Sequence, residues 1–186
     1  YDTTQTFFGY PISGLNPITS YDFYVQAICG AGDTSYWSGP FTFTTPCAAL
    51  VPSQLEDFSN GFPPNACWDQ AGDGDPGTGP TGIGTSSWTQ DGFGNAGTSG
   101  AVKVNLFTLG KQEWILSPQY DFTNGGPFQI EFDFGVFIWN QSNPGQLGSD
   151  DRVEVLISRD GGTTWNGLNN FNNNYITGPN GNHEII

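Results

Sequence analysis

Basic residues are scarce in this sequence. Lysine and arginine together number four, whereas aspartate and glutamate number 18, so the formal net charge is −14. Such a chain repels the phosphate backbone of nucleic acids and the surface of anionic membranes, and we expect neither as a partner. The same excess of carboxylates favours divalent cations, because hard metal ions prefer oxygen ligands.

Long apolar runs are also missing. No stretch approaches the ~20 apolar residues that a membrane-spanning helix needs, so we expect no membrane insertion. No signal-peptide pattern stands at the N-terminus, which predicts that the sequence starts within a longer protein or has been processed.

Histidine occurs once, at position 183. The dipeptide His183-Glu184 matches the start of the zincin motif H-E-x-x-H, but zinc needs a second histidine on the next helical turn. The β-branched residues Ile185 and Ile186 follow instead, so the segment predicts the start of a strand. A single histidine, with nothing around it to support a Ser-His-Asp or Cys-His set, also argues against nucleophilic catalysis.

Cysteine is limited to Cys29, Cys47 and Cys67. None stands in a C-x-x-C pair, so the spacing does not indicate a zinc site. An odd number of cysteines in a protein of secreted type leaves one of them without a partner in this chain.

What the sequence does contain is typical of an all-β protein. Aromatic residues make up 15% of the chain, and glycine (27 residues) and proline (13) are frequent. β-Branched and aromatic runs alternate with turn residues, and no apolar stripe with helical spacing covers ten residues. We therefore predict an all-β fold.

The N-terminal part contains strand-like segments separated by loops and turns. Three strands are predicted, at 4–12 (TQTFFGYPI), 21–29 (YDFYVQAIC) and 40–46 (PFTFTTP). The string GLNPITSYDFYVQAICGAGDTSYWSGPFTFTTPC resembles the last three strands of a fibronectin type III domain, with Tyr21 at the place of that family's tyrosine corner. The resemblance covers roughly residues 5–46. It implies that 1–46 are the C-terminal part of such a sandwich, whose earlier strands are absent.

The predicted strands constrain the cysteines. If 21–29 and 39–45 form a hairpin, Cys29 lies near its turn and Cys47 beyond its open end, more than about 20 Å away. A disulfide requires Cα atoms within ~7 Å, so this pair is not expected to bond. Cys47 and Cys67 flank a short predicted strand, SQLEDF, and can close a loop there. Cys29 then pairs with a cysteine upstream of this chain or stays free.

From Cys47 onward the sequence resembles a MAM-like or cleaved-adhesin-like jelly roll. Those families open with a cysteine, an E-D/N-F strand and a C-W pair, which correspond here to Cys47, Glu56-Asp57-Phe58 and Cys67-Trp68. The later segments follow in the family's order: SSWTQDG, SGAVKVNLF, KQEWILSPQYDFT, FQIEFDFGVF and DDRVEVLISRDGGTTWNGL. The resemblance implies a jelly-roll β-sandwich over 47–186, with its closing strands missing.

Two segments without periodicity are predicted to be surface loops, at 71–87 (AGDGDPGTGPTGIGTSS) and 166–182 (NGLNNFNNNYITGPNGN).

The jelly-roll resemblance also implies calcium near the first strand and the neighbouring loops. The candidate ligands are Glu56 and Asp57 from the family motif, and Asp73, Asp75, Asp150 and Asp151 from their placement in predicted loops. Solvated acids that bind no metal are the alternative.

Residues 158–165 (SRDGGTTW) resemble the Asp-box hairpin of sialidase propellers. A sialidase needs several such boxes and an arginine cluster for the substrate carboxylate, whereas this chain has one box and two arginines. Gly161 and Gly162 suit a tight turn, and the Asp160 carboxylate can accept backbone N–H groups. We predict a structural turn that leads out of the strand DRVEVLIS.

Glycoside hydrolases place two carboxyl groups ~5–10 Å apart across a cleft. Glu131 and Asp133 share one face of a predicted strand, opposite Ile130, Phe132 and Phe134. Because antiparallel sheets commonly expose one face to water, we interpret the two acids as a solvated face and assign no catalytic residue.

The aromatic residues exceed what one core requires. Trp139 runs from a predicted strand into a loop, and Trp88 stands in the segment SSWTQDG. Aromatic rings stack on the C–H faces of sugars, so Trp139 and Trp88 are the candidate ligand-binding residues. Packing in the core or at a sheet edge is the alternative.

Together these features predict a non-catalytic adhesion module, binding carbohydrate or protein, of a large secreted bacterial surface protein. The domain pairing resembles modular proteins exported by the type IX secretion system. It implies an extracellular location and a glycan, a surface protein or neighbouring copies of the protein as partner. The alternatives are an accessory module of a secreted peptidase or glycoside hydrolase, and a structural spacer in a surface filament.

Overall fold

The computed structural model describes residues 11–186 and is all-β, as predicted. Among these residues the helical structure is a 3₁₀ turn, η1 (Phe93–Asn95), and no helix is long and apolar enough to cross a membrane. The chain divides into two units, Tyr1–Ala48 and Ala49–Ile186. This division lies close to the boundary expected between residues 46 and 47. That the units belong to the two families named above stays a prediction.

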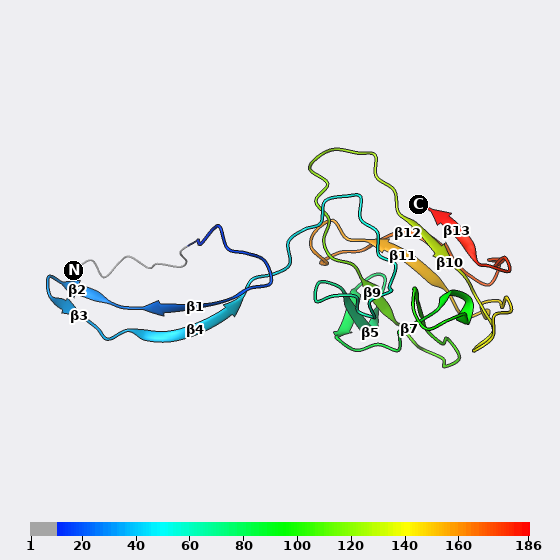
Figure 1. Ribbon diagram of the computed structural model, residues 1–186, viewed down its shortest axis with the longest axis horizontal. Coiled ribbons are helices and arrows are strands. Elements are labelled where there is room, and N and C mark those ends of the chain that lie inside the picture. Colours follow the sequence, from blue (N-terminus) through cyan, green and yellow to red (C-terminus); the bar gives the residue numbers. More distant parts are fainter. Residues whose placement is uncertain (1–10) are drawn as a thin grey trace. The chain divides into compact units, whose positions relative to one another are not determined.

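Unit 1 contains two antiparallel hairpins, which pair β1 (Ser20–Val25) with β4 (Ser38–Thr44) and β2 (Ile28–Gly30) with β3 (Asp33–Thr34) (Figure 1). The β1–β4 register places Tyr21 opposite Phe43 and Phe23 opposite Phe41. Because side chains alternate along a strand, these rings share one face, with centroids 5.9 Å and 5.2 Å apart in the two pairs. The alternation read from the sequence therefore corresponds to a real aromatic face.

The loop before β1 is tied to that strand by a tyrosine. The Tyr21 hydroxyl accepts a hydrogen bond from the backbone N–H of Asn16 at 2.9 Å, which is the kind of contact a tyrosine corner makes. The strand expected at 21–29 is divided into β1 and β2 by two residues outside either ladder. The strand expected at 4–12 lies outside the described residues, except for its last two positions, which are irregular.

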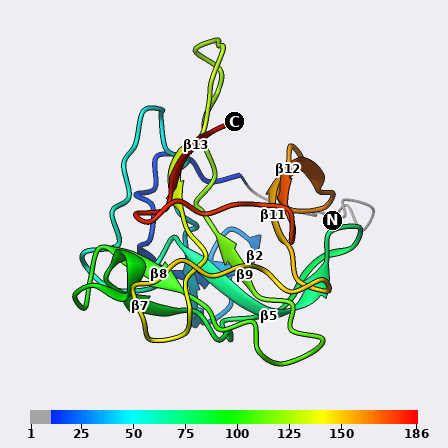
Figure 2. The same cartoon turned by 90° about the vertical axis from the view of Figure 1, so that its right-hand side faces the viewer.

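Unit 2 is built from small antiparallel sheets (Figures 1 and 2). A three-stranded sheet has the order β6-β5-β9, and three further ladders pair β7 with β8, β10 with β13 and β11 with β12. The strands are β5 (Asp69–Asp75), β6 (Gly79–Ile83), β7 (Thr89–Asp91), β8 (Ala101–Lys103), β9 (Trp114–Leu116), β10 (Glu131–Phe134), β11 (Val153–Ile157), β12 (Asn166–Phe171) and β13 (Asn182–Ile185).

Two segments expected to be loops are strands, and those expectations were wrong. Segment 71–87 supplies most of β5 and all of β6, and 166–182 supplies β12 and the first residue of β13. These segments are rich in glycine and asparagine and lack the alternation of apolar and polar residues that predicts a strand. Their strands are held by backbone hydrogen bonds, which the sequence pattern does not reveal. A tertiary contact favours the β5–β6 hairpin. The Trp165 ring lies so close to Gly79 of β6 that any side chain at position 79 would clash with it.

Segment 53–58, expected to be a strand, has no ladder partner; it is irregular and leads into a turn at 59–60. The Glu56 carboxylate accepts the N–H of Phe58 at 2.7 Å, and Asp57 accepts that of Ser59 at 2.9 Å. Acidic side chains that bond to the backbone two residues on favour turns over strands, which explains the difference.

An aromatic cluster around the buried Phe171 forms part of the core of unit 2. The Phe134 ring lies 4.8 Å from Phe171 and 5.1 Å from Tyr175, measured between centroids, and Phe171 is 3% exposed. The Tyr175 hydroxyl donates to the Glu184 carboxylate at 2.7 Å. Burial raises the pKa of Tyr175 to about 12, and the bond to Glu184 adds to this shift. The cluster therefore joins β10, β12 and β13.

Cys47 and Cys67 form a disulfide, which confirms the pairing inferred from the sequence. Cys29 lies in β2, where it is exposed and has no disulfide within residues 11–186. A structural disulfide indicates folding in an oxidising compartment.

Candidate functional site

Trp139 marks a defined surface site in unit 2. It follows β10 in a tight turn, where the Ile138 N–H donates to the Asn143 carbonyl at 3.0 Å. The residue is 49% exposed, and the Lys103 ammonium lies 4.8 Å from the centre of its ring. Because an ammonium is attracted to the face of an indole, Lys103 orients the ring and leaves the remainder of it accessible.

The Lys103 ammonium is the hub of a polar network. It forms an ion pair with Asp91 across the β7–β8 ladder and donates to Asn95 Oδ1 at 3.1 Å and Asn140 Oδ1 at 3.4 Å. The hydrogen bond from Lys103 lowers the pKa of Asp91, so this carboxylate stays charged at neutral pH. The pair is partly screened from water, since the two side chains are 27% and 16% exposed.

Both asparagines of this network sit at backbone positions that few side chains tolerate. Asn95 has a φ of 58° and Asn140 a φ of 55°, in the left-handed region that asparagine adopts more readily than most residues. The Asn95 amide also donates to the Gln141 carbonyl at 2.7 Å, which ties η1 to the turn after β10. Phe93 and Phe137 pack edge to face in the same region. The polar groups around Trp139 therefore lie on turns that are fixed by hydrogen bonds and aromatic packing.

Trp88, the other candidate ligand-binding residue, lies in a different environment. Its ring is half-buried, and its Nε1 is buried with no hydrogen-bond partner among the described residues. Its backbone N–H donates to the Ser86 hydroxyl at 3.1 Å. A ring in this position presents less surface to a ligand than Trp139 does.

The predicted calcium ligands act as hydrogen-bond acceptors in the chain. Glu56 and Asp57 accept the backbone N–H groups given above, and the bonds from Ser59 lower the pKa of Asp57. Asp73 and Asp75 lie on β5, not in a loop as expected. Asp75 accepts the Gly77 N–H at 2.7 Å and so closes the β5–β6 turn.

Asp150 and Asp151 occupy the turn before β11. The Gly148 N–H donates to Asp151 Oδ2 at 2.9 Å, and the Asp150 carboxylate approaches the same glycine. Within the described part of the chain, no three His, Cys, Asp or Glu side chains lie close enough together to hold a metal ion. Calcium binding stays a prediction from the sequence.

The SRDGGTTW segment is a structural turn, as predicted, and connects β11 to β12. Asp160 Oδ1 accepts the N–H groups of Thr163 and Thr164 at 3.1 Å and 2.8 Å, and its Oδ2 accepts the Thr164 hydroxyl at 2.6 Å. Bonds from Thr164 are the largest cause that lowers the pKa of Asp160 to about 2. The Trp165 ring contacts Trp114 edge to face, with centroids 5.8 Å apart. The Asp160 carboxylate and its Thr163 and Thr164 partners thus serve the hairpin.

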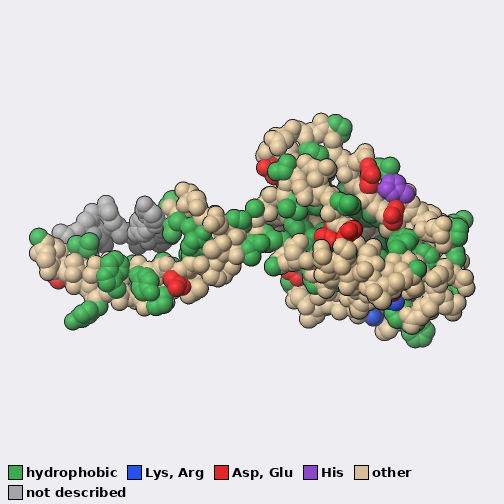
Figure 3. All heavy atoms as spheres, viewed as in Figure 1, with side chains coloured by type: hydrophobic (Ala, Val, Ile, Leu, Met, Phe, Trp, Pro, Cys, Tyr) green, Lys and Arg blue, Asp and Glu red, His purple; other side chains and the backbone are tan. Residues whose placement is uncertain are grey.

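Glu131 and Asp133 lie on the solvated face of β10, as interpreted from the sequence, and His183 of β13 lies opposite them (Figure 3). His183 Nδ1 is 3.0 Å from Asp133 Oδ1, and its Nε2 is 3.6 Å from Glu131 Oε2. The bond to Asp133 is the main cause that raises the pKa of His183. The segment at His183 begins a strand, as predicted.

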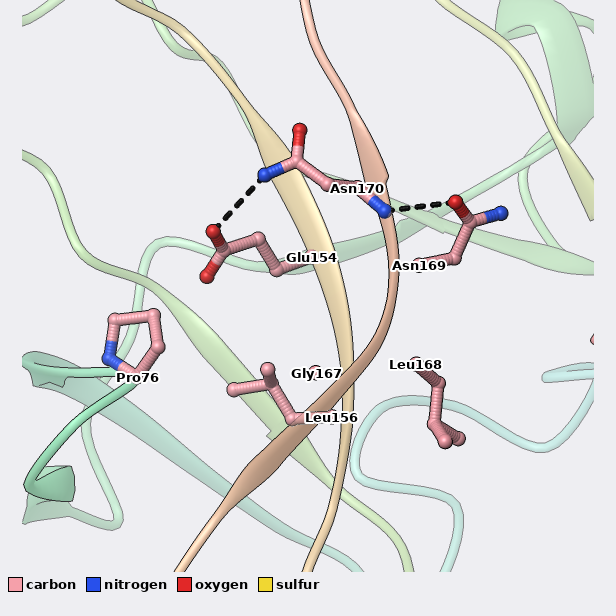
Figure 4. A pocket seen from close by; sticks show the side chains of 7 residues that line it. All are labelled: Pro76, Glu154, Leu156, Gly167, Leu168, Asn169 and Asn170. Atoms are coloured by element: carbon pink, nitrogen blue, oxygen red, sulfur yellow. Dashed lines mark hydrogen bonds between the residues drawn. The ribbon is translucent and has the colours of Figure 1, made fainter.

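A hollow of about 500 Å³ lies beside the β11–β12 hairpin (Figure 4). It is lined by Pro76, Glu154, Leu156, Gly167, Leu168, Asn169 and Asn170. None of these residues was singled out as a ligand-binding candidate from the sequence. Six of them lie on β11 and β12, and Pro76 comes from the distant β5–β6 turn.

Sequence reasoning also missed the surroundings of Trp139. The one sequence signal for Lys103 is its rarity, because the chain has only four basic residues. Asp91, Asn95 and Asn140 stand in segments of ordinary turn composition and show no such signal.

Comparisons with protein-family models, with curated proteins and with solved structures find no match to this chain.

Proposed function

We propose that this chain is part of an extracellular, non-catalytic adhesion module that binds carbohydrate at Trp139. The observation that carries the proposal is the half-exposed indole beside the polar groups of Lys103, Asn95 and Asn140. A sugar ring has an apolar C–H face and a rim of hydroxyl groups. It therefore matches an aromatic plate that is flanked by hydrogen-bond donors and acceptors.

The charges at this site favour a neutral sugar over an acidic one. Lys103 is already paired with Asp91, so an acidic sugar would have to compete with that carboxylate for the ammonium. The net charge of −14 adds long-range repulsion toward anionic ligands. A neutral hydroxylated ligand avoids both costs.

Other features support an extracellular binding role over catalysis. The Cys47–Cys67 disulfide suits an oxidising environment, and the site lies on turns carried by β-sheet scaffolding, where binding residues are commonly placed. Glu131 and Asp133, the acids weighed as a catalytic pair, are both well exposed on an open sheet face. The resemblance to type IX-secreted surface proteins is in keeping with adhesion.

A glycan array probed with the full chain tests the proposal, followed by calorimetric titration of the best neutral glycan. Trp139→Ala removes the stacking surface and is expected to weaken binding at least about tenfold, as for a central aromatic contact. Trp37→Ala in unit 1 is the matched control, because this tryptophan is also exposed, at 65%. We expect it to bind like the wild type.

Two results would contradict the proposal. One is an array without any glycan signal for the folded wild-type chain. The other is a signal that survives in Trp139→Ala, which would move the site elsewhere.

A further inference from the structure

The hollow beside β11 and β12 is open to solvent and is lined by both apolar and polar residues. Leu156 of β11 pairs with Gly167 of β12, and Pro76 from the β5–β6 turn faces them (Figure 4). Because Gly167 has no side chain opposite Leu156, the sheet face is recessed at that point. The opening can therefore admit a slender side chain between Leu156 and Pro76.

A carboxylate stands over the same hollow with one oxygen unused. Glu154 Oε1 accepts hydrogen bonds from Asn170 Nδ2 at 3.0 Å and from Arg152 Nε at 2.9 Å. Among residues 11–186 no hydrogen bond reaches its Oε2. The Glu154 side chain is 21% exposed, and its carboxylate lies on the Pro76 side of the hairpin. One oxygen therefore fixes the carboxylate, and the other is available to a ligand.

We propose that this hollow binds an arginine side chain of a partner protein. The methylene stem of the arginine lies between Leu156 and Pro76, and its guanidinium donates to Glu154 Oε2. Asn170 holds the carboxylate in place for this contact, because its Nδ2 donates to the other oxygen of Glu154. A guanidinium carries several donors and is less strongly hydrated than an ammonium, so it suits a largely buried carboxylate oxygen better than an ammonium does.

The net charge of the chain also favours a basic ligand such as arginine. With a net charge of −14, the surface attracts basic partners and accelerates their approach. The chain's own Arg152 does not fill the role, because it donates to Oε1 and its side chain is 57% exposed. Because Arg152 binds Oε1, its hydrogen bond leaves Oε2 open to a second guanidinium.

The test is a titration of the full chain with two capped tripeptides, followed by calorimetry or NMR. Acetyl-Gly-Arg-Gly-amide carries the charge, whereas acetyl-Gly-citrulline-Gly-amide has nearly the same shape without it. We expect the arginine peptide to bind at least about tenfold more tightly than the citrulline peptide, because a charge-assisted hydrogen bond is lost. Glu154→Gln is expected to abolish this preference, and Glu131→Gln, the control on β10, is expected to retain it.

A second variant fills the hollow. A Cβ at Gly167 would lie 4.0 Å from Leu156 Cδ2, and the backbone there is not left-handed, so Gly167→Leu introduces bulk without backbone strain. With its fold checked by circular dichroism, this variant should lose arginine binding while its glycan binding stays unchanged. Trp139→Ala should show the reverse, which separates this proposal from the carbohydrate site.

Three results would overturn the proposal: no binding of the arginine peptide at millimolar concentration, equal binding of the two peptides, or a preference that persists in Glu154→Gln. Equal binding would assign the hollow to a neutral ligand. If Gly167→Leu fails to fold, Glu154→Gln alone decides.

Discussion

Asp160 shows how one side chain can organise a turn. Its carboxylate accepts bonds from Ser158, Thr163 and Thr164, and each of these bonds favours the charged form. The folded pKa is therefore about 2, against an ordinary value of 3.8. A lowered pKa contributes stability that is present above the unfolded value and lost as the pH falls through the folded one.

We expect Asp160→Asn to melt below the wild type at pH 5, because the amide cannot accept the Thr164 hydroxyl with its nitrogen. The difference in melting temperature should shrink between about pH 4 and pH 2, where the wild-type carboxylate becomes protonated. Thermal unfolding followed by circular dichroism at several pH values measures this. A difference that stays constant over that range would show that the charge of Asp160 does not stabilise the turn.

The two tryptophans that are ligand-binding candidates from the sequence differ in their exposure and contacts. Trp139 is oriented by a cation and stays half-exposed, whereas the Nε1 of Trp88 is buried without a partner among the described residues. In the sequence, both are aromatic residues near the ends of predicted strands, and nothing distinguishes them. Only their surroundings distinguish a ligand surface from a packed ring.

At the scale of elements, His183 links the strands β10 and β13. It bridges Asp133 and Glu131 across the ladder, and its pKa is raised above 6.5, mainly by Asp133. A raised pKa contributes stability that is fully present below the unfolded value. That stability is lost as the pH rises through the higher folded value. The β10–β13 ladder should therefore be firmer in mildly acidic solution.

Amide hydrogen exchange tests this prediction. After correction for intrinsic rates, the amides of β13 should be better protected at pH 5.5 than at pH 8 in the wild type. In His183→Gln the protection should be equal at the two values, because glutamine carries no titratable group. Protection in the wild type that does not depend on pH would refute the link between the histidine and the ladder.

The same scale shows where sequence reasoning about elements succeeds. Strands with alternating apolar side chains, such as β1 and β10, follow directly from their pattern, and the Asp160 turn follows from its glycines and acid. Strands rich in glycine or asparagine, such as β6 and β12, do not. Their ladders depend on neighbours supplied by other segments.

At the scale of the whole molecule, the disulfide is the strongest covalent constraint. It closes the loop from Cys47 to Cys67, which has no strand between those residues. A cross-link of this length removes conformational entropy from the unfolded chain and is worth about 3 kcal/mol in the chain-entropy account.

We expect the double variant Cys47→Ser, Cys67→Ser to lose about 3 kcal/mol of unfolding free energy in urea titrations. Cys29→Ser is the control, because Cys29 is exposed and free in the described chain, and its removal should change stability little. If the double variant unfolds like the control, the disulfide does not contribute through chain entropy.

The sequence by itself determined the all-β class, the face that each alternating strand presents, the SRDGGTTW turn and the cysteine pair. These features depend on residues close together in the chain or on the reach of the backbone. The tertiary structure decided which polar groups surround Trp139 and which residues line the hollow at Glu154. The groups around Trp139 come from distant segments, and Pro76 meets the β11–β12 hairpin only in the folded chain. The energy that brings them together lies in contacts between strands, which no local pattern records.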